Sequence, residues 1–88
     1  MNIGYIHARN DRCSDYIVQE RLLINLHCEK IFTDEGNQYP ALFHAISECN
    51  IGGNVYCLPL EAFDIEETLK KEIRQFSNVK NIRLNELI

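Results

Sequence analysis

Residues 52–60, with the sequence GGNVYCLPL, decide the fold class of this 88-residue chain. Gly52 and Gly53 end a helical pattern and turn the chain, and residues 54–60 then form a near-continuous apolar run. Such a run is typical of a strand that is covered on both faces, as in parallel sheets. Pro59 cannot donate a hydrogen bond to a neighbouring strand, so we expect it at the strand end or at a bulge.

Two strand–helix units precede this strand. We expect strands over residues 2–7 (NIGYIH) and 29–33 (EKIFT), a helix over residues 15–27, and an exposed polar loop over residues 34–39. A second helix begins at Pro40, which suits the first position of a helix. Its apolar face is formed by Ala41, Leu42, Ala45, Ile46 and Cys49.

A third helix and a fourth strand follow. Asp64 and Glu67 form a capping-box-like pair, and residues 81–87 read as a strand. The apolar stripe of the helix is Ile65, Leu69, Ile73 and Phe76. The order βαβαβαβ with short connections predicts a small three-layer α/β domain with a mainly parallel four-stranded sheet. The chain length has room for one such domain, spanning residues 1–88.

The charge pattern argues against direct DNA binding. Nine basic and 13 acidic side chains give a net charge of −4. Residues 31–69 contain no Lys or Arg. The acidic residues of that window are Asp34, Glu35, Glu48, Glu61, Asp64, Glu66 and Glu67. A phosphate group would be repelled by such a surface, because phosphate contacts need clustered basic side chains.

Cysteines and histidines give no sign of a metal or cofactor site. The cysteines are Cys13, Cys28, Cys49 and Cys57, and the histidines are His7, His27 and His44. The cysteine spacing contains no C-x-x-C pair, so we expect reduced, mostly buried thiols in a cytoplasmic protein. No apolar run approaches the roughly 20 residues of a membrane span, and the N-terminus has no signal-peptide pattern. We therefore expect no metal, no cofactor and no membrane partner.

Several motifs occur in one collinear order along the chain. They are MNIGY at 1–5, Gln19 and Leu23, CEKIF at 28–32 followed by Asp34, Pro40-x-Leu42-x-x-Ala45, and GGNVYCLPLE at 52–61. Together they resemble the N-terminal catalytic domain of the serine recombinases, the resolvase and invertase family, over nearly the whole chain. The resemblance implies a resolvase-like fold, a bacterial source, and a link to DNA recombination or mobile elements.

The resemblance also locates a degenerate catalytic site. In that family a serine attacks a DNA phosphodiester, and several arginines neutralise charge on the phosphate. Tyr5 matches the first motif, but its arginine position holds His7 and its nucleophile position holds Arg9. Tyr39 replaces the arginine before the second helix, and the Asp-Arg-x-x-Arg site reads Glu61, Ala62 and Ile65. An arginine cannot act as an alkoxide nucleophile, so the resemblance implies no recombinase catalysis and no catalytic residue. We also expect neither the family's long dimerisation helix nor its helix-turn-helix domain.

Three other sets of residues have both a purely structural and a functional interpretation. Ser14 reads as a helix cap rather than a displaced nucleophile. His7, Arg9 and Arg12 offer a weak anion site on the loop after the first strand, or simply a solvated loop. The basic residues of the last helix, Lys70, Lys71 and Arg74, read as a solvated face, with Glu66–Lys70 and Glu67–Lys71 as ion pairs at i, i+4.

Three functions compete at this point. The first, which we favour, is a non-catalytic resolvase-like module for protein interaction or regulation, with a protein partner or a second copy. The second is a small-molecule-binding protein or acid–base enzyme at the carboxyl end of the sheet, with His7 and Glu61 as candidates. The third is a regulator that pairs with an active recombinase.

Overall fold

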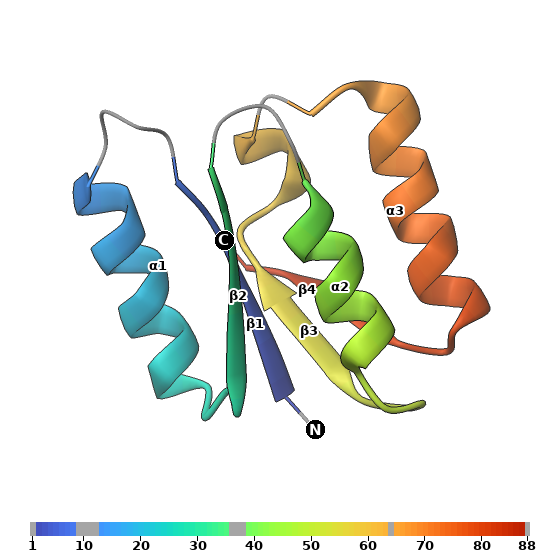
Figure 1. Ribbon diagram of the computed structural model, residues 1–88, viewed down its shortest axis with the longest axis horizontal. Helices are drawn as coiled ribbons and strands as arrows, with labels where there is room; N and C mark the ends of the chain where they lie inside the picture. The colour runs from blue at the N-terminus through green and yellow to red at the C-terminus, as the bar shows by residue number, and fades with distance from the viewer. Residues whose placement is uncertain (1, 9–12, 36–38, 64, 88) are drawn as a thin grey trace.

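Four parallel strands form one sheet in the order β2-β1-β3-β4 (Figure 1). The computed structural model describes residues 2–8, 13–35, 39–63 and 65–87. The strands are β1 (Asn2–Ala8), β2 (Lys30–Glu35), β3 (Asn54–Cys57) and β4 (Arg83–Glu86). The helices are α1 (Cys13–Asn25), α2 (Pro40–Glu48), the 3₁₀ turn η1 (Leu60–Ala62) and α3 (Glu67–Val79).

The elements form three layers, which confirms the predicted α/β fold class. Helix α1 lies on one face of the sheet, and helices α2 and α3 lie on the other face (Figure 1). The main core lies between the sheet and this second helical layer, where Ile3, Val55 and Leu42 are fully buried. Within the described ranges, no helix is long and apolar enough to span a membrane.

The close approach of α1 to β1 depends on Gly4. A Cβ atom at this position would lie 2.7 Å from the Cδ1 atom of Leu23, which is itself buried. Real Cβ atoms do not approach other carbons so closely, so a larger residue would require the Leu23 side chain or α1 to shift. Glycine therefore leaves space for Leu23 to pack directly against β1.

Strand β3 differs from its prediction in length and in burial. It ends at Cys57 rather than at residue 60, and Pro59 follows the strand end as expected. Val55 and Cys57 are buried, but Asn54 and Tyr56 are only half-buried. The prediction of a strand covered on both faces was wrong, because α1 packs mainly on β1 and leaves this face of β3 partly open. Polar side chains suit such a face, and here Asn54 hydrogen-bonds to both Asn2 and Asn85.

The last helix and strand are shorter than predicted. Helix α3 begins at Glu67, with Glu66 at the N-cap position and no side-chain cap. Asp64, the predicted cap, lies outside the described residues. Ile73 is fully buried in the predicted stripe, and β4 covers only Arg83–Glu86 of the expected 81–87. Helix α2 matches its prediction, since it begins at Pro40 and buries its apolar face.

Candidate functional site

Strands β1 and β3 separate at their carboxyl ends. Only residues 2–4 of β1 pair with β3, whereas β1 pairs with β2 as far as Ala8. Because the strand order reverses between β1 and β3, this is the position where open α/β sheets bind ligands. The residues around this opening are therefore the first candidates for a functional site.

Gln19 of α1 takes the place of the missing strand. Its Oε1 accepts a hydrogen bond from the backbone N–H of His7 at 3.3 Å, and its Nε2 donates to the carbonyl of His7 at 3.1 Å. These are the two backbone groups that β3 would bond if it continued alongside β1. The Gln19 side chain is buried and so closes the opening from the side of α1.

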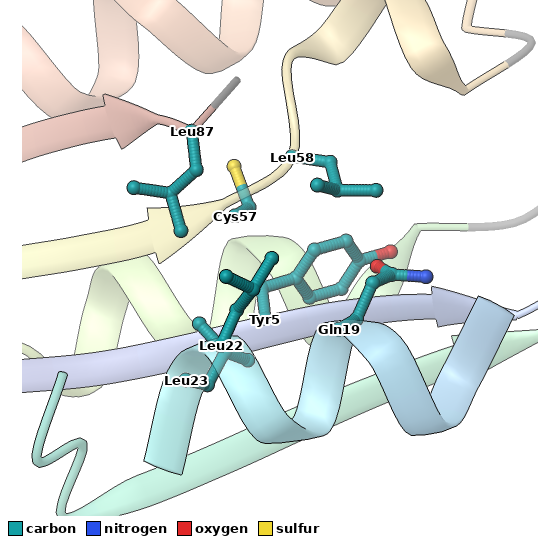
Figure 2. Close-up of a pocket in the computed structure, with 7 residues that line it drawn as sticks. All are labelled: Tyr5, Gln19, Leu22, Leu23, Cys57, Leu58 and Leu87. Atoms are coloured by element: carbon teal, nitrogen blue, oxygen red, sulfur yellow. The ribbon is translucent and has the colours of Figure 1, made fainter. Parts of the chain in front are cut away.

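Apolar side chains fill the rest of the opening. Figure 2 shows the crevice between α1 and the ends of β3 and β4, with Leu22, Leu58 and Leu87 around the ring of Tyr5. The crevice is too narrow to hold a water molecule. Cys57 lies at its base, where burial and the nearby carboxylate of Glu86 raise the pKa of the thiol to about 12. A protonated, buried thiol is a poor nucleophile, so Cys57 acts as a packing residue.

On the other side of the sheet, three polar side chains bond to one another. The hydroxyl of Tyr5 donates to Oδ2 of Asp34 at 2.8 Å and lies 3.0 Å from Nδ1 of His7. The hydroxyl has one proton and directs it at Asp34. In the second hydrogen bond it must therefore act as the acceptor, with a protonated Nδ1 of His7 as the donor. All three residues are buried. Burial, followed by the bond to Asp34, raises the pKa of Tyr5 above its ordinary value, so the phenol stays neutral.

Asp34 also holds the start of α2. Its carboxylate accepts hydrogen bonds from the backbone N–H groups of Ala41, at 3.0 Å, and Leu42, at 3.3 Å. A carboxylate at this position is stabilised by the unpaired N–H groups and the dipole of the helix. The prediction of an exposed loop over 34–39 was wrong at both ends, because Asp34 belongs to β2 and Tyr39 is buried.

Aromatic rings close this cluster. The ring of His7 stacks on Tyr39, with ring centroids 4.6 Å apart, and lies 5.4 Å from Phe63. Phe63 also meets Tyr5 edge-on. We call Tyr5, His7, Asp34, Tyr39 and Phe63 the carboxyl-end cluster. Among the described residues, the Tyr5 hydroxyl bonds to His7 and Asp34, and Asp34 also bonds to the start of helix α2.

Glu61 belongs to a different set of contacts. Its carboxylate lies 3.0 Å from the guanidinium of Arg74, which also contacts Glu86 at 3.1 Å. The hydrogen bond from Arg74 lowers the pKa of Glu61, so this exposed carboxyl is ionised near neutral pH. Glu86 accepts a further bond from the backbone N–H of Leu60. Arg74 therefore ties α3 to η1 and β4 instead of standing on a solvated face.

The ion pairs predicted along α3 need a second correction. Lys70 is 7% exposed and bonds to Glu67, three residues earlier, at 3.0 Å. The predicted partner at i−4 was Glu66. The apolar stem of a buried lysine packs in the interior while its ammonium reaches the surface, which explains its place in the buried stripe.

The structure separates the residues of the predicted degenerate site. Tyr5, His7 and Tyr39 meet in the carboxyl-end cluster, Glu61 bonds to Arg74, Ala62 is exposed, and Ile65 is buried. Arg9 and Arg12 lie outside the described residues, as does the side chain of Ser14. The remaining member of the predicted anion site, His7, is buried and bonded to Tyr5. Among the described residues, no group of three or more metal-ligating side chains comes together.

Three contacts were not predicted from the sequence. Gln19 bonds to the backbone of β1 in place of a strand, Phe63 packs on the rings of Tyr5 and His7, and Arg74 joins α3 to η1 and β4. Asp34 had one local signal, since an acidic residue shortly before a helix that begins with proline can bond its first N–H groups. The other contacts join elements that are far apart in sequence, so no local pattern marks them.

Comparisons with known proteins do not assign the chain to a family. No family model matches the chain, and a search of curated proteins also finds no match.

Proposed function

We propose that this chain is a non-catalytic, resolvase-like module that works by binding protein. The observation that carries the proposal is the carboxyl-end cluster, in which the buried Tyr5 hydroxyl bonds to both His7 and Asp34. Gln19 and leucine side chains fill the switch-point opening beside it. This arrangement supports a framework role for the residues that carry the family resemblance.

The acid–base alternative finds less support. Glu61 is ionised and bonded to Arg74, and His7 is bonded to Tyr5, so the two candidates have separate partners. A general acid must hold a proton near neutral pH, and the lowered pKa of Glu61 works against that.

Exposed apolar side chains favour protein association. Val18 is 59% exposed, and one turn later on α1 Leu22, which lines the crevice beside Cys57 and Leu58, is 38% exposed (Figure 2). Ile24 of the same helix is 57% exposed. We place the module in the cytoplasm, because Cys28, Cys49 and Cys57 form no disulfide in the described part of the chain, and link it to recombination through the family resemblance alone.

Two assays on the purified chain test this proposal. Incubation with supercoiled plasmid and Mg²⁺ should give no nicked or linear product, and a thermal-shift screen of nucleotides, sugars and small acids should give no saturable rise in Tm. Nicking that disappears in the Ser14→Ala or Tyr5→Phe variant would contradict the proposal. A saturable ligand would favour the small-molecule alternative, and co-purification with a full-length serine recombinase would favour the regulator.

A further inference from the structure

The outer edge of β4 presents backbone groups that pair with no other strand in the described part of the chain. Strand β4 lies at the end of the sheet order, beside β3. The N–H groups of Arg83 and Leu87 donate to the carbonyls of Gly53 and Cys57. In a parallel ladder, alternate residues bond to one neighbour, and the residues between them direct their N–H and C=O groups to the other side. Leu84 and Glu86 therefore point their backbone groups outward.

The surroundings of this edge leave room for another strand. An open hollow of about 480 Å³ runs between β4 and α3, lined on the helix by Arg74, Ser77 and Asn78. The opposite edge of the sheet is protected by charge, since β2 carries Lys30 and Glu35 at its two ends. Charged side chains on edge strands oppose strand addition. The β4 edge also carries two charged residues, Arg83 and Glu86. The carboxylate of Glu86 is already bonded to Arg74 and to the N–H of Leu60, and the outward-directed segment is centred on the uncharged Leu84.

The side chains of β4 are complementary to a second copy of the same strand. In an antiparallel pair with its two-fold axis at Leu84, the two Leu84 residues form a hydrogen-bonded pair and their side chains meet on the α3 face. Arg83 then lies opposite Asn85 of the other copy on the opposite face. The guanidinium of Arg83 has no ion pair among the described residues. Asn85 uses its Nδ2 for bonds to Asn54 and to the Arg83 carbonyl, which leaves Oδ1 to accept from the incoming guanidinium.

We infer that this chain forms a two-fold homodimer by antiparallel pairing of β4 with β4 of a second copy. The inference deepens the proposed function and rests on it, because it names the partner and the surface. A two-fold axis closes the interface, so two copies share this edge and the sheet becomes continuous across them. The paired segment is short, so the dimer is reversible rather than permanent.

Hydrogen exchange tests the geometry without a mutation. The amides of Leu84 and Glu86 should exchange at least about tenfold more slowly at millimolar than at micromolar protein concentration, because the partner strand protects them. The amides of Arg83 and Leu87 are the internal control, since both already bond to β3 and should not depend on concentration. Equal exchange of Leu84 at all concentrations would overturn the inference.

Sedimentation equilibrium of edge variants tests the interface. Leu84→Pro removes the outward N–H without removing a bond to β3, and Leu84→Ala is the matched control that loses the side chain but keeps the N–H. Leu84→Pro should weaken dimerisation by about tenfold or more relative to Leu84→Ala. If Leu84→Pro does not fold, Arg83→Glu replaces it, with Arg21→Glu on exposed α1 as the control of equal charge change.

The outcomes separate this inference from the proposed function. Association that survives Leu84→Pro and Arg83→Glu but is lost in Val18→Glu would overturn the β4 interface and keep the interaction module. A chain that stays monomeric to about 1 mM would overturn the homodimer. The proposed function would then be tested separately by the cleavage and ligand assays.

Discussion

At the scale of single residues, the Tyr5 hydroxyl joins two buried polar groups on neighbouring strands. It accepts a hydrogen bond from the Nδ1–H of His7 and donates one to Asp34. A buried polar group that loses its partner costs more than a hydrogen bond contributes, because the group has already left water. Loss of the Tyr5 hydroxyl oxygen should therefore lower the stability of the folded chain.

Tyr5→Phe should lower the free energy of unfolding by about 1–3 kcal/mol, measured by urea denaturation, because it leaves His7 and Asp34 without this partner. Tyr56→Phe is the matched control on the neighbouring strand. The Tyr56 hydroxyl makes no hydrogen bond to the described residues, so we expect a change within about 0.5 kcal/mol. Equal effects of the two variants would contradict the role assigned to the Tyr5 hydroxyl.

The raised pKa of the Cys57 thiol should make the free energy of unfolding depend on pH in the alkaline range. The thiol pKa is about 12 in the folded chain against an ordinary value of 9.0, so the folded state holds this proton more tightly. The stabilisation is complete below pH 9 and is lost as the pH rises from 9 towards 12. We expect the free energy of unfolding to fall by about 1 kcal/mol between pH 8 and pH 10 from this group alone. Cys57→Ala should show a shallower decline, and an unchanged slope would refute the assignment.

At the scale of elements, Asp34 couples the end of β2 to the start of α2. Its carboxylate accepts from the first helical N–H groups while it binds the Tyr5 hydroxyl. The resemblance to the recombinases includes both Tyr5 and Asp34, and here they form one structural unit. Conservation of such a pair would therefore not by itself indicate catalysis.

Asp34→Ala should destabilise the chain by about 2–4 kcal/mol, since it removes a helix cap and the acceptor of the Tyr5 hydroxyl. Amide exchange should also accelerate at Ala41 and Leu42. The neighbouring Glu35→Ala variant loses an exposed carboxylate and should stay within about 0.5 kcal/mol of the unmodified chain. If α2 exchange were unchanged in Asp34→Ala, the capping role would be wrong.

At the scale of the whole molecule, charge decides the interaction with nucleic acid. The net charge is −4. Residues 31–69 contain no Lys or Arg, and some of their acidic side chains form ion pairs with basic residues outside this segment, such as Glu48 with Lys30 and Glu61 with Arg74. These pairs engage Lys30, at the amino end of β2, and Arg74 on α3. Surface phosphate contacts need clustered basic groups, which residues 31–69 lack.

The chain should therefore not co-sediment with supercoiled plasmid at about 0.15 M salt. Lowering the salt to about 0.01 M lengthens the range of electrostatic repulsion and should not create binding. Binding that weakens steeply as salt is added would show that a basic surface exists, and our charge argument would fail. An unrelated basic protein of similar size serves as the positive control.

Much of the fold was predictable from the sequence, whereas the site was predictable only in part. The parallel order of four strands, the helix at Pro40 and the strand end near Pro59 were confirmed, because each depends on a local pattern. The apolar run at 54–60 misled the prediction of burial, since a run of apolar residues does not say which helix covers it. Tyr5, His7 and Tyr39 were candidate positions from the sequence, but the hydrogen bond from Tyr5 to Asp34 and the ring contacts with Phe63 were not predicted.

The sequence by itself determined the α/β class and the low supply of basic side chains. These are properties of composition, periodicity and residue identity, which local chemistry fixes. Only the tertiary structure decided that Gln19 substitutes for a strand at the switch point, that Arg74 joins three elements, and that Leu84 faces an open edge. Those outcomes depend on which distant backbone and side-chain groups meet, and a buried polar group takes whichever partner the packing of the helices on the sheet brings within reach.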